Sequence, residues 1–151
     1  AYLYEDLGRL ADAESLYRKT IELQRAQSGG LDPETWAVLN NLAMLLVNDG
    51  RAEEARPLFE ELLELCAASL PADHYYTAIF KTNLALCLTD LEHYDEAQAL
   101  LLEAHPILEA ALGAEHPRTI TTVERLVDAY ERGGQSRRAD RWRNRLVASG
   151  P

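Results

Sequence analysis

Apolar residues recur at three- and four-residue spacing along most of the chain, which is the spacing of one face of an α-helix. One such pattern starts after Asp32-Pro33, an N-cap residue followed by a proline at the first helical position. It ends at Asn48-Asp49-Gly50, a sequence typical of a turn, and a second pattern follows. No segment alternates with period two, so an all-α chain of helical hairpins is predicted. The two apolar faces contain Leu39, Leu42, Ala43 and Leu46, and then Ala55, Leu58, Phe59, Leu62 and Cys66.

The same arrangement returns every 42 residues, most clearly in four alanines and in a turn position that is glycine three times and glutamate once. Neither helix of such a hairpin can bury its apolar stripe alone, so the hairpins are expected to stack into a solenoid. The recurring positions are Ala13, Ala55, Ala97 and Ala139 for the alanines, and Gly8, Gly50, Glu92 and Gly134 for the turn. The predicted units are a partial repeat, 1–31, two full repeats, 32–73 and 74–115, and a terminal repeat, 116–151.

Inside these units the apolar pattern sets approximate helix limits. In the second full repeat it predicts helices over 78–90 and from 94 to about 112. In the terminal repeat His116-Pro117 is another start signal, and helices are predicted from there to 131 and from about 136 to 148. Residues 1–7 align with the end of a first helix, so Gly8 is expected in a turn.

Composition narrows the class of partner. With 47% apolar residues the chain can bury a core, but it has no run of 18 or more apolar residues that could span a membrane. Its first residues lack the pattern of a secretion signal, so a cytoplasmic location is expected. The net charge of −10 argues against nucleic acid, because such binding depends on Lys and Arg neutralising phosphates.

The charge is unevenly distributed. Residues 1–117 carry 7 basic and 21 acidic side chains, a balance of −14, whereas residues 118–151 carry 8 basic and 4 acidic, a balance of +4. Either the basic end is a solvated surface that keeps the array soluble, or it docks on an acidic partner or on the acidic body of another copy. The basic residues are Arg118, Arg125, Arg132, Arg137, Arg138, Arg141, Arg143 and Arg145.

We find no pattern that predicts catalysis, a metal or a cofactor. His74 and His116 share one repeat position immediately before a helix, which indicates capping rather than metal binding. No glycine-rich phosphate loop is present, and no isolated acid lies inside an apolar run where burial would adapt it to acid or base chemistry. Cys66 and Cys87 lie within apolar helical patterns and are expected to be core thiols. The chain is therefore not expected to be an enzyme.

The motifs Leu39-Asn40-Asn41-Leu42-Ala43 and Gly50-Arg51-Ala52-Glu53-Glu54-Ala55 resemble the tetratricopeptide repeat in its longer, 42-residue form. Repeats of this kind occur in kinesin light chains and in many bacterial regulatory proteins. The resemblance covers essentially the whole chain and implies an all-α, right-handed superhelical solenoid of antiparallel helix hairpins. It also implies a scaffold for protein interactions, although the same scaffold serves many partners.

In that family the first helix of each hairpin lines a concave groove, where asparagines hold the backbone of an extended peptide. An amide suits this role because it offers both a donor and an acceptor to any main chain. Carried over by position, Asn41, Asn83 and Arg125 form one groove row, and Asn40, Thr82 and Glu124 form a second. These rows lack the Lys and Asn pair with which some relatives hold a terminal carboxylate, so that type of clamp is not expected. Carried over by position, the expected peptide-binding residues are Asn40, Asn41, Met44, Ile79, Thr82, Asn83, Leu86 and Arg125.

Two alternatives remain open at this stage. The asparagines could tie neighbouring helices together instead of holding a peptide. The chain could also be a self-assembly module, in which the basic terminal repeat of one copy pairs with the acidic surface of another to form a homo-oligomer. Our principal expectation is a scaffold that binds a peptide or protein segment.

Overall fold

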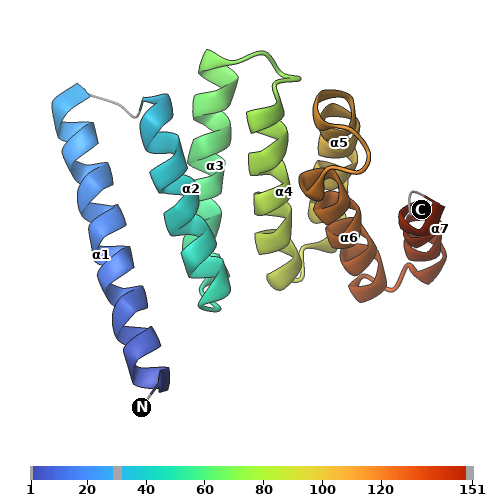
Figure 1. Ribbon diagram of the computed structural model, residues 1–151, viewed down its shortest axis with the longest axis horizontal. Helices are drawn as coiled ribbons and strands as arrows, with labels where there is room; N and C mark the ends of the chain where they lie inside the picture. The colour runs from blue at the N-terminus through green and yellow to red at the C-terminus, as the bar shows by residue number, and fades with distance from the viewer. Residues whose placement is uncertain (1, 29–31, 149–151) are drawn as a thin grey trace. The chain divides into compact units, whose positions relative to one another are not determined.

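The computed structural model describes residues 2–28 and 32–148, which form seven α-helices and contain no strand. The predicted repeat boundary between residues 31 and 32 touches the undescribed residues. The helices are α1 (Tyr2–Ser28), α2 (Pro33–Asn48), α3 (Ala52–Ser69), α4 (Tyr75–Asp90), α5 (Tyr94–Leu112), α6 (Pro117–Arg132) and α7 (Ser136–Ala148). Figure 1 shows α1 beside α2, and it shows α4 to α7 following one another as packed neighbours.

The observed limits agree with the sequence pattern within about three residues, with one exception at Gly8. The predicted turn there is wrong, because α1 continues without interruption through this residue. Glycine permits a left-handed turn residue without requiring one, and here the helical conformation continues through it. A further small difference is that α4 begins at Tyr75 rather than at residue 78, because His74 caps the helix.

The three hairpin turns share one backbone geometry. Gly50, Glu92 and Gly134 occupy the recurring turn position with φ values of 76°, 64° and 77°. In each turn the N–H of the next residue bonds to a carbonyl five residues back, for example from Arg51 to Leu46 at 2.8 Å. This is the Schellman ending of a helix, which requires a left-handed residue. Glu92 therefore holds a conformation that glycine adopts without a steric penalty.

The first helices of the hairpins begin with two kinds of cap. Asp32 accepts hydrogen bonds from the backbone N–H of Thr35 at 3.0 Å and from its hydroxyl at 2.7 Å. His74 and His116 instead accept a backbone N–H two residues further on, through Nδ1. The equivalent hydroxyls of the threonines in these helices, Thr77 and Thr119, are buried and lack a hydrogen-bond partner among the described residues.

The chain divides into two compact parts, an N-terminal part (residues 1–65) and a C-terminal part (residues 66–151), with the division inside α3. Each part has its own apolar core. Three of the four recurring alanines are fully buried, while Ala13 on α1 is half-buried. The largest fully buried apolar side chains are Leu39, Leu42, Leu46, Phe59 and Leu62 in the N-terminal part, and Leu88, Leu101, Leu108 and Leu126 in the C-terminal part.

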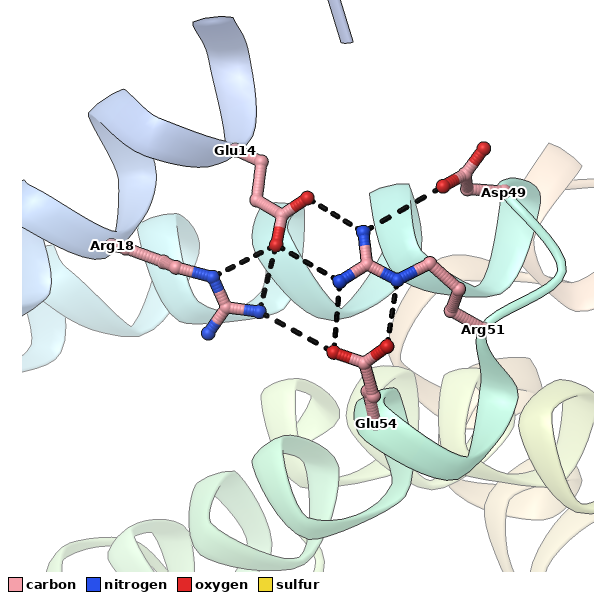
Figure 2. A network of polar contacts seen from close by, with 5 residues as sticks. All are labelled: Glu14, Arg18, Asp49, Arg51 and Glu54. Atoms are coloured by element: carbon pink, nitrogen blue, oxygen red, sulfur yellow. Dashed lines mark hydrogen bonds and ion pairs between the residues drawn. The ribbon is translucent and has the colours of Figure 1, made fainter. Parts of the chain in front are cut away.

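In both parts, polar side chains connect the second helix of one hairpin to the turn inside the next hairpin. In the N-terminal part, Arg51, in the turn immediately before α3, donates to the Glu14 carboxylate of α1 at 2.6 and 3.1 Å. Arg18, Glu54 and Asp49 complete the network (Figure 2). In the C-terminal part, the Gln135 amide donates to the Gln98 carbonyl at 3.3 Å. The two pairs occupy the same repeat positions, so one contact is made with charges in one part and with neutral amides in the other.

Candidate functional site

Helices α4 and α6 are the first helices of consecutive hairpins, and they pack side by side within the C-terminal part (Figure 1). Between them lies a cleft of about 240 Å³. Four of the eight predicted peptide-binding residues contribute to its lining. The cleft is lined by Ile79, Thr82 and Asn83 from α4, and by Pro117, Arg118, Thr121 and Arg125 from α6.

Arg125 is the central polar group of the cleft. Its Nη1 donates to the Thr82 carbonyl oxygen at 3.0 Å and to the Asn83 Oδ1 at 2.9 Å, and it lies 3.5 Å from the Thr82 hydroxyl. The guanidinium thus bridges α6 to α4 through one nitrogen. For Asn83, the predicted tie between neighbouring helices is therefore present, because its side-chain oxygen accepts this bond.

The cleft carries positive charge. Burial lowers the pKa of Arg125, and the nearby charge of Arg118 lowers it further. Arginine nevertheless stays protonated, because its pKa lies far above neutral pH. Within the part of the chain that the structure describes, neither arginine forms an ion pair with a carboxylate. The oxygens of Thr82 and Asn83 accept hydrogen bonds from Arg125, but they are neutral and do not balance its charge.

An aromatic group lies at the beginning of α4, outside the residues that line the cleft. The rings of Tyr75 and Tyr76 lie 4.5 Å apart, and Tyr76 stacks towards Phe80 at 6.4 Å. The hydrogen bond with Tyr76 raises the pKa of Tyr75, followed by burial, while the charge of Arg118 lowers it.

The other predicted residues lie outside this cleft. Leu86 is half-buried on α4 and does not line it. Asn40, Asn41 and Met44 lie on α2 in the N-terminal part, where Asn41 is exposed and the other two are half-buried. The structure thus brings together Ile79, Thr82, Asn83 and Arg125.

The sequence analysis missed three lining residues, Pro117, Arg118 and Thr121. Arg118, Thr121 and Arg125 are spaced by three and four residues, so they share one helix face. That spacing was a usable signal, because Arg125 had already been placed in the groove row. Pro117 had been assigned only to the helix start.

A second hollow, of about 510 Å³, lies around the turn between α4 and α5 and contains none of the predicted residues. Its polar lining is mainly acidic, with Glu92, Asp95 and Glu96 beside His93. In the described ranges no group of three or more His, Cys, Asp or Glu side chains is arranged to hold a metal ion. Cys66 and Cys87 are buried free thiols, and burial raises the pKa of Cys66.

Comparison with known proteins identifies the repeat. The family model described as tetratricopeptide repeat matches residues 1–68, 37–109 and 76–148. The chain belongs to the tetratricopeptide repeat family. Tetratricopeptide repeats are protein-interaction modules, and proteins of this type are typically non-enzymatic scaffolds.

Solved structures of tetratricopeptide repeat proteins share this fold. A kinesin light chain-like protein of Podosopora anserina with nearly identical TPR-like repeats aligns with a TM-score of 0.86 at 24% identity, over 97% of this chain and 69% of its own. A second structure of that protein gives a TM-score of 0.85 at 24% identity, over 97% and 70%. BtubC (BKLC) from P. vanneervenii aligns with a TM-score of 0.65 at 19% identity, over 99% and 79%. The predicted all-α solenoid of TPR hairpins is thereby confirmed.

No curated protein matches the chain. Among the described residues, no helix is both long and apolar enough to cross a membrane.

Proposed function

We propose that this tetratricopeptide repeat protein binds an extended peptide segment, and that the α4–α6 cleft is a principal contact. The observation that carries the proposal is the convergence of Ile79, Thr82, Asn83 and Arg125 on one cleft between two consecutive first helices. Ile79 offers an apolar surface to an anchor side chain, and the polar residues offer donors and acceptors to a main chain. An affinity of about 1 μM, roughly −8 kcal/mol, is typical of such a small contact.

The predicted row on α2 belongs to the same proposal. Asn41 is exposed, so its amide is accessible to a peptide without rearrangement of the core. It also provides a cleaner test than Asn83, whose side-chain oxygen accepts a hydrogen bond from Arg125. Asn41→Ala should leave the thermal midpoint unchanged and weaken peptide binding, whereas the equivalent change at Asn83 would also remove a tie between α4 and α6.

A random dodecapeptide library displayed on phage provides the decisive experiment. Peptides selected on the wild-type chain should bind at least tenfold less tightly to Thr121→Tyr, because the larger side chain fills the cleft from a half-buried position. Asp128→Tyr is the matched control, since it adds the same ring at an exposed position of α6 outside the cleft. The proposal fails if no peptide is enriched, or if the selected peptides bind both variants equally.

One observation favours self-assembly as a second candidate function. In the C-terminal part, His105 of α5 packs on Trp142 of α7, with the ring centroids 5.0 Å apart. By the 42-residue register, His105 corresponds to Val147, and Trp142 corresponds to Leu16. Val147 is 75% exposed and Leu16 is 63% exposed. Leu16 and Val147 are therefore exposed apolar side chains at the two repeat positions whose members His105 and Trp142 contact each other.

A second copy could complete this contact by placing its Leu16 against Val147, with Arg137 and Arg141 exposed on the same helix α7. Sedimentation velocity would then show a mass that increases with protein concentration. Leu16→Asp and Val147→Asp should each be monomeric alone, and their mixture should form dimers because one intact pair remains. A monomer at all concentrations refutes this candidate, and dissociation by salt would assign the dominant contact to the arginines.

A further inference from the structure

The network of Figure 2 lies where the second helices of two successive hairpins meet, a contact that we call the joint. One side of the joint is an acidic half, in which Glu14 of α1 pairs with Arg18 at 2.8 Å. The other side is a basic half, in which Arg51 pairs with Glu54 at 2.7 Å. Arg51 connects the two halves by donating to Glu14 at 2.6 Å. Each half is thus an ion pair between residues close in sequence, and a further ion pair joins them.

The two halves recur on α7 and on α1. Three repeat periods after Glu14 stands Asp140 on α7, which pairs with Arg143 at 2.6 Å, three residues further on instead of four. One period before the basic half stand Arg9 and Asp12 on α1, an arginine and an acid in the same order, and both are exposed. Within the described ranges neither of these two residues forms an ion pair. Helix α7 thus presents an acidic half and α1 a basic half, each without its counterpart in the described chain.

Apolar side chains at the joint follow the same register. Ile21 of α1 and Leu58 of α3 stand at the repeat positions of the two contacting rings of α5 and α7, and they line one small hollow in the N-terminal part. Val147 on α7 and Leu16 on α1 are the remaining members of these positions, and they are 75% and 63% exposed. Leu23, seven residues after Leu16 on the same helix face, is also exposed. Exposed apolar side chains thus accompany both exposed charged halves.

We propose that a second copy of this chain continues the repeat in register, so that α1 of one copy packs on α7 of another and Arg9 pairs with Asp140 at the joint. Opposite charges then meet, and Leu16 lies on Val147, as the equivalent residues do within the chain. This inference rests on self-assembly, the second candidate function, and specifies its contact residues and its polarity. Because the two faces differ, one joint leaves one face of each kind available, and further copies can add.

Charge reversal at the two proposed contact residues tests the inference by sedimentation velocity. Arg9→Glu and Asp140→Arg should each weaken self-association at least about tenfold, because two like charges replace two opposite ones at the joint. An equimolar mixture of these variants should associate as tightly as the wild type, since opposite charges meet at every joint between unlike copies. Arg141→Glu is the matched control, because it reverses a charge on α7 at a repeat position that is exposed in all four repeats. It should leave the association unchanged.

The outcomes separate the register of the joint from self-assembly itself. If Leu16→Asp abolishes association but neither charge reversal weakens it, or if the mixture associates no better than the separate variants, the in-register joint is wrong while self-assembly stands. A wild-type mass that stops at a dimer would also overturn the inference, because it indicates a symmetric contact. A monomer at every concentration removes both. Circular dichroism should show the same helix content in all variants, since Arg9, Asp140 and Arg141 are exposed.

Discussion

Removal of the Glu14 charge should destabilise the N-terminal part by about 1 kcal/mol at neutral pH. Hydrogen bonds from Arg51 and then Arg18 lower the pKa of Glu14 from 4.5 to about 2. A difference of that size between folded and unfolded states corresponds to at most about 3.4 kcal/mol. The side chains of Glu14, Arg51 and Arg18 are 18%, 34% and 45% exposed, so solvent screening reduces the contribution to about 1 kcal/mol.

The pH dependence of this contribution has a definite sign. A carboxylate with a lowered pKa in the folded state stabilises the fold fully above its unfolded pKa, and the effect disappears as the pH falls through the folded pKa. For Glu14 this window extends from about pH 4.5 down to about pH 2. Glu14→Gln should therefore be less stable than the wild type at pH 7 and equally stable near pH 2.

The two tryptophans allow the N-terminal part to be observed separately. Trp36 is buried in the N-terminal part and Trp142 lies in the C-terminal part, so a Trp142→Phe background leaves Trp36 as the reporter. Urea unfolding followed by Trp36 fluorescence should show a midpoint lower by about 1 M for Glu14→Gln, since m is about 1 kcal/mol/M for a unit of this size. Glu53→Gln, a change at an exposed residue of α3, is the control.

The Gln98 and Gln135 pair suggests a stricter version of the test. Glu14→Gln combined with Arg51→Gln would reproduce in the N-terminal part the neutral contact of the C-terminal part. The double variant should lose less stability than the sum of the single variants, because each single variant leaves one charge of the Glu14–Arg51 pair without its partner and the double variant removes both charges. Equal stability of Glu14→Gln and the wild type at pH 7, or a Glu14 pKa near 4.5 by NMR, would refute the reasoning.

Three further changes should alter stability in predictable directions. Glu92→Gly should stabilise the C-terminal part by about 1 kcal/mol, measured by urea unfolding, because glycine adopts the observed φ of 64° without strain. His116→Asp should raise the thermal midpoint by the equivalent of about 1 kcal/mol, because a carboxylate can accept from the buried Thr119 hydroxyl; an unchanged midpoint would contradict this. Burial lowers the pKa of His105, so the NMR titration of its ring should give a pKa below 6.5. The free energy of unfolding should therefore fall as the pH decreases below 6.5. A His105 pKa above 6.5 would contradict its packing on Trp142.

The helices could be predicted because each one carries its own apolar stripe and its own stop signal. The limits of α5 and α7, for example, follow directly from the pattern and its turns. The prediction of a turn at Gly8 was wrong because glycine permits the left-handed backbone conformation without requiring it. Such a turn forms where two helices pack against each other, and that depends on segments on both sides of it.

The candidate site was predictable only in its register. The 42-residue period places Asn83 and Arg125 in one row, and the structure joins them by a hydrogen bond of 2.9 Å. Periodicity says nothing about which side-chain atoms meet, so the bridge from Arg125 to the Thr82 carbonyl could not be foreseen. The contact between the Trp142 and His105 rings, whose centroids lie 5.0 Å apart, is equally beyond what periodicity can specify.

The contrast between scaffold and site positions explains where function can vary in this fold. The hydrogen bond between the second helix of one hairpin and the turn of the next is made by Glu14 with Arg51 and again by Gln98 with Gln135. We call this contact the tie. The pair at these repeat positions is charged in one case and neutral in the other. The groove row changes from Asn83 to Arg125, and this change places an uncompensated cation in the cleft instead of a neutral amide. Charge at the tie is paired with an opposite charge, whereas among the described residues Arg125 in the cleft contacts neutral oxygens only.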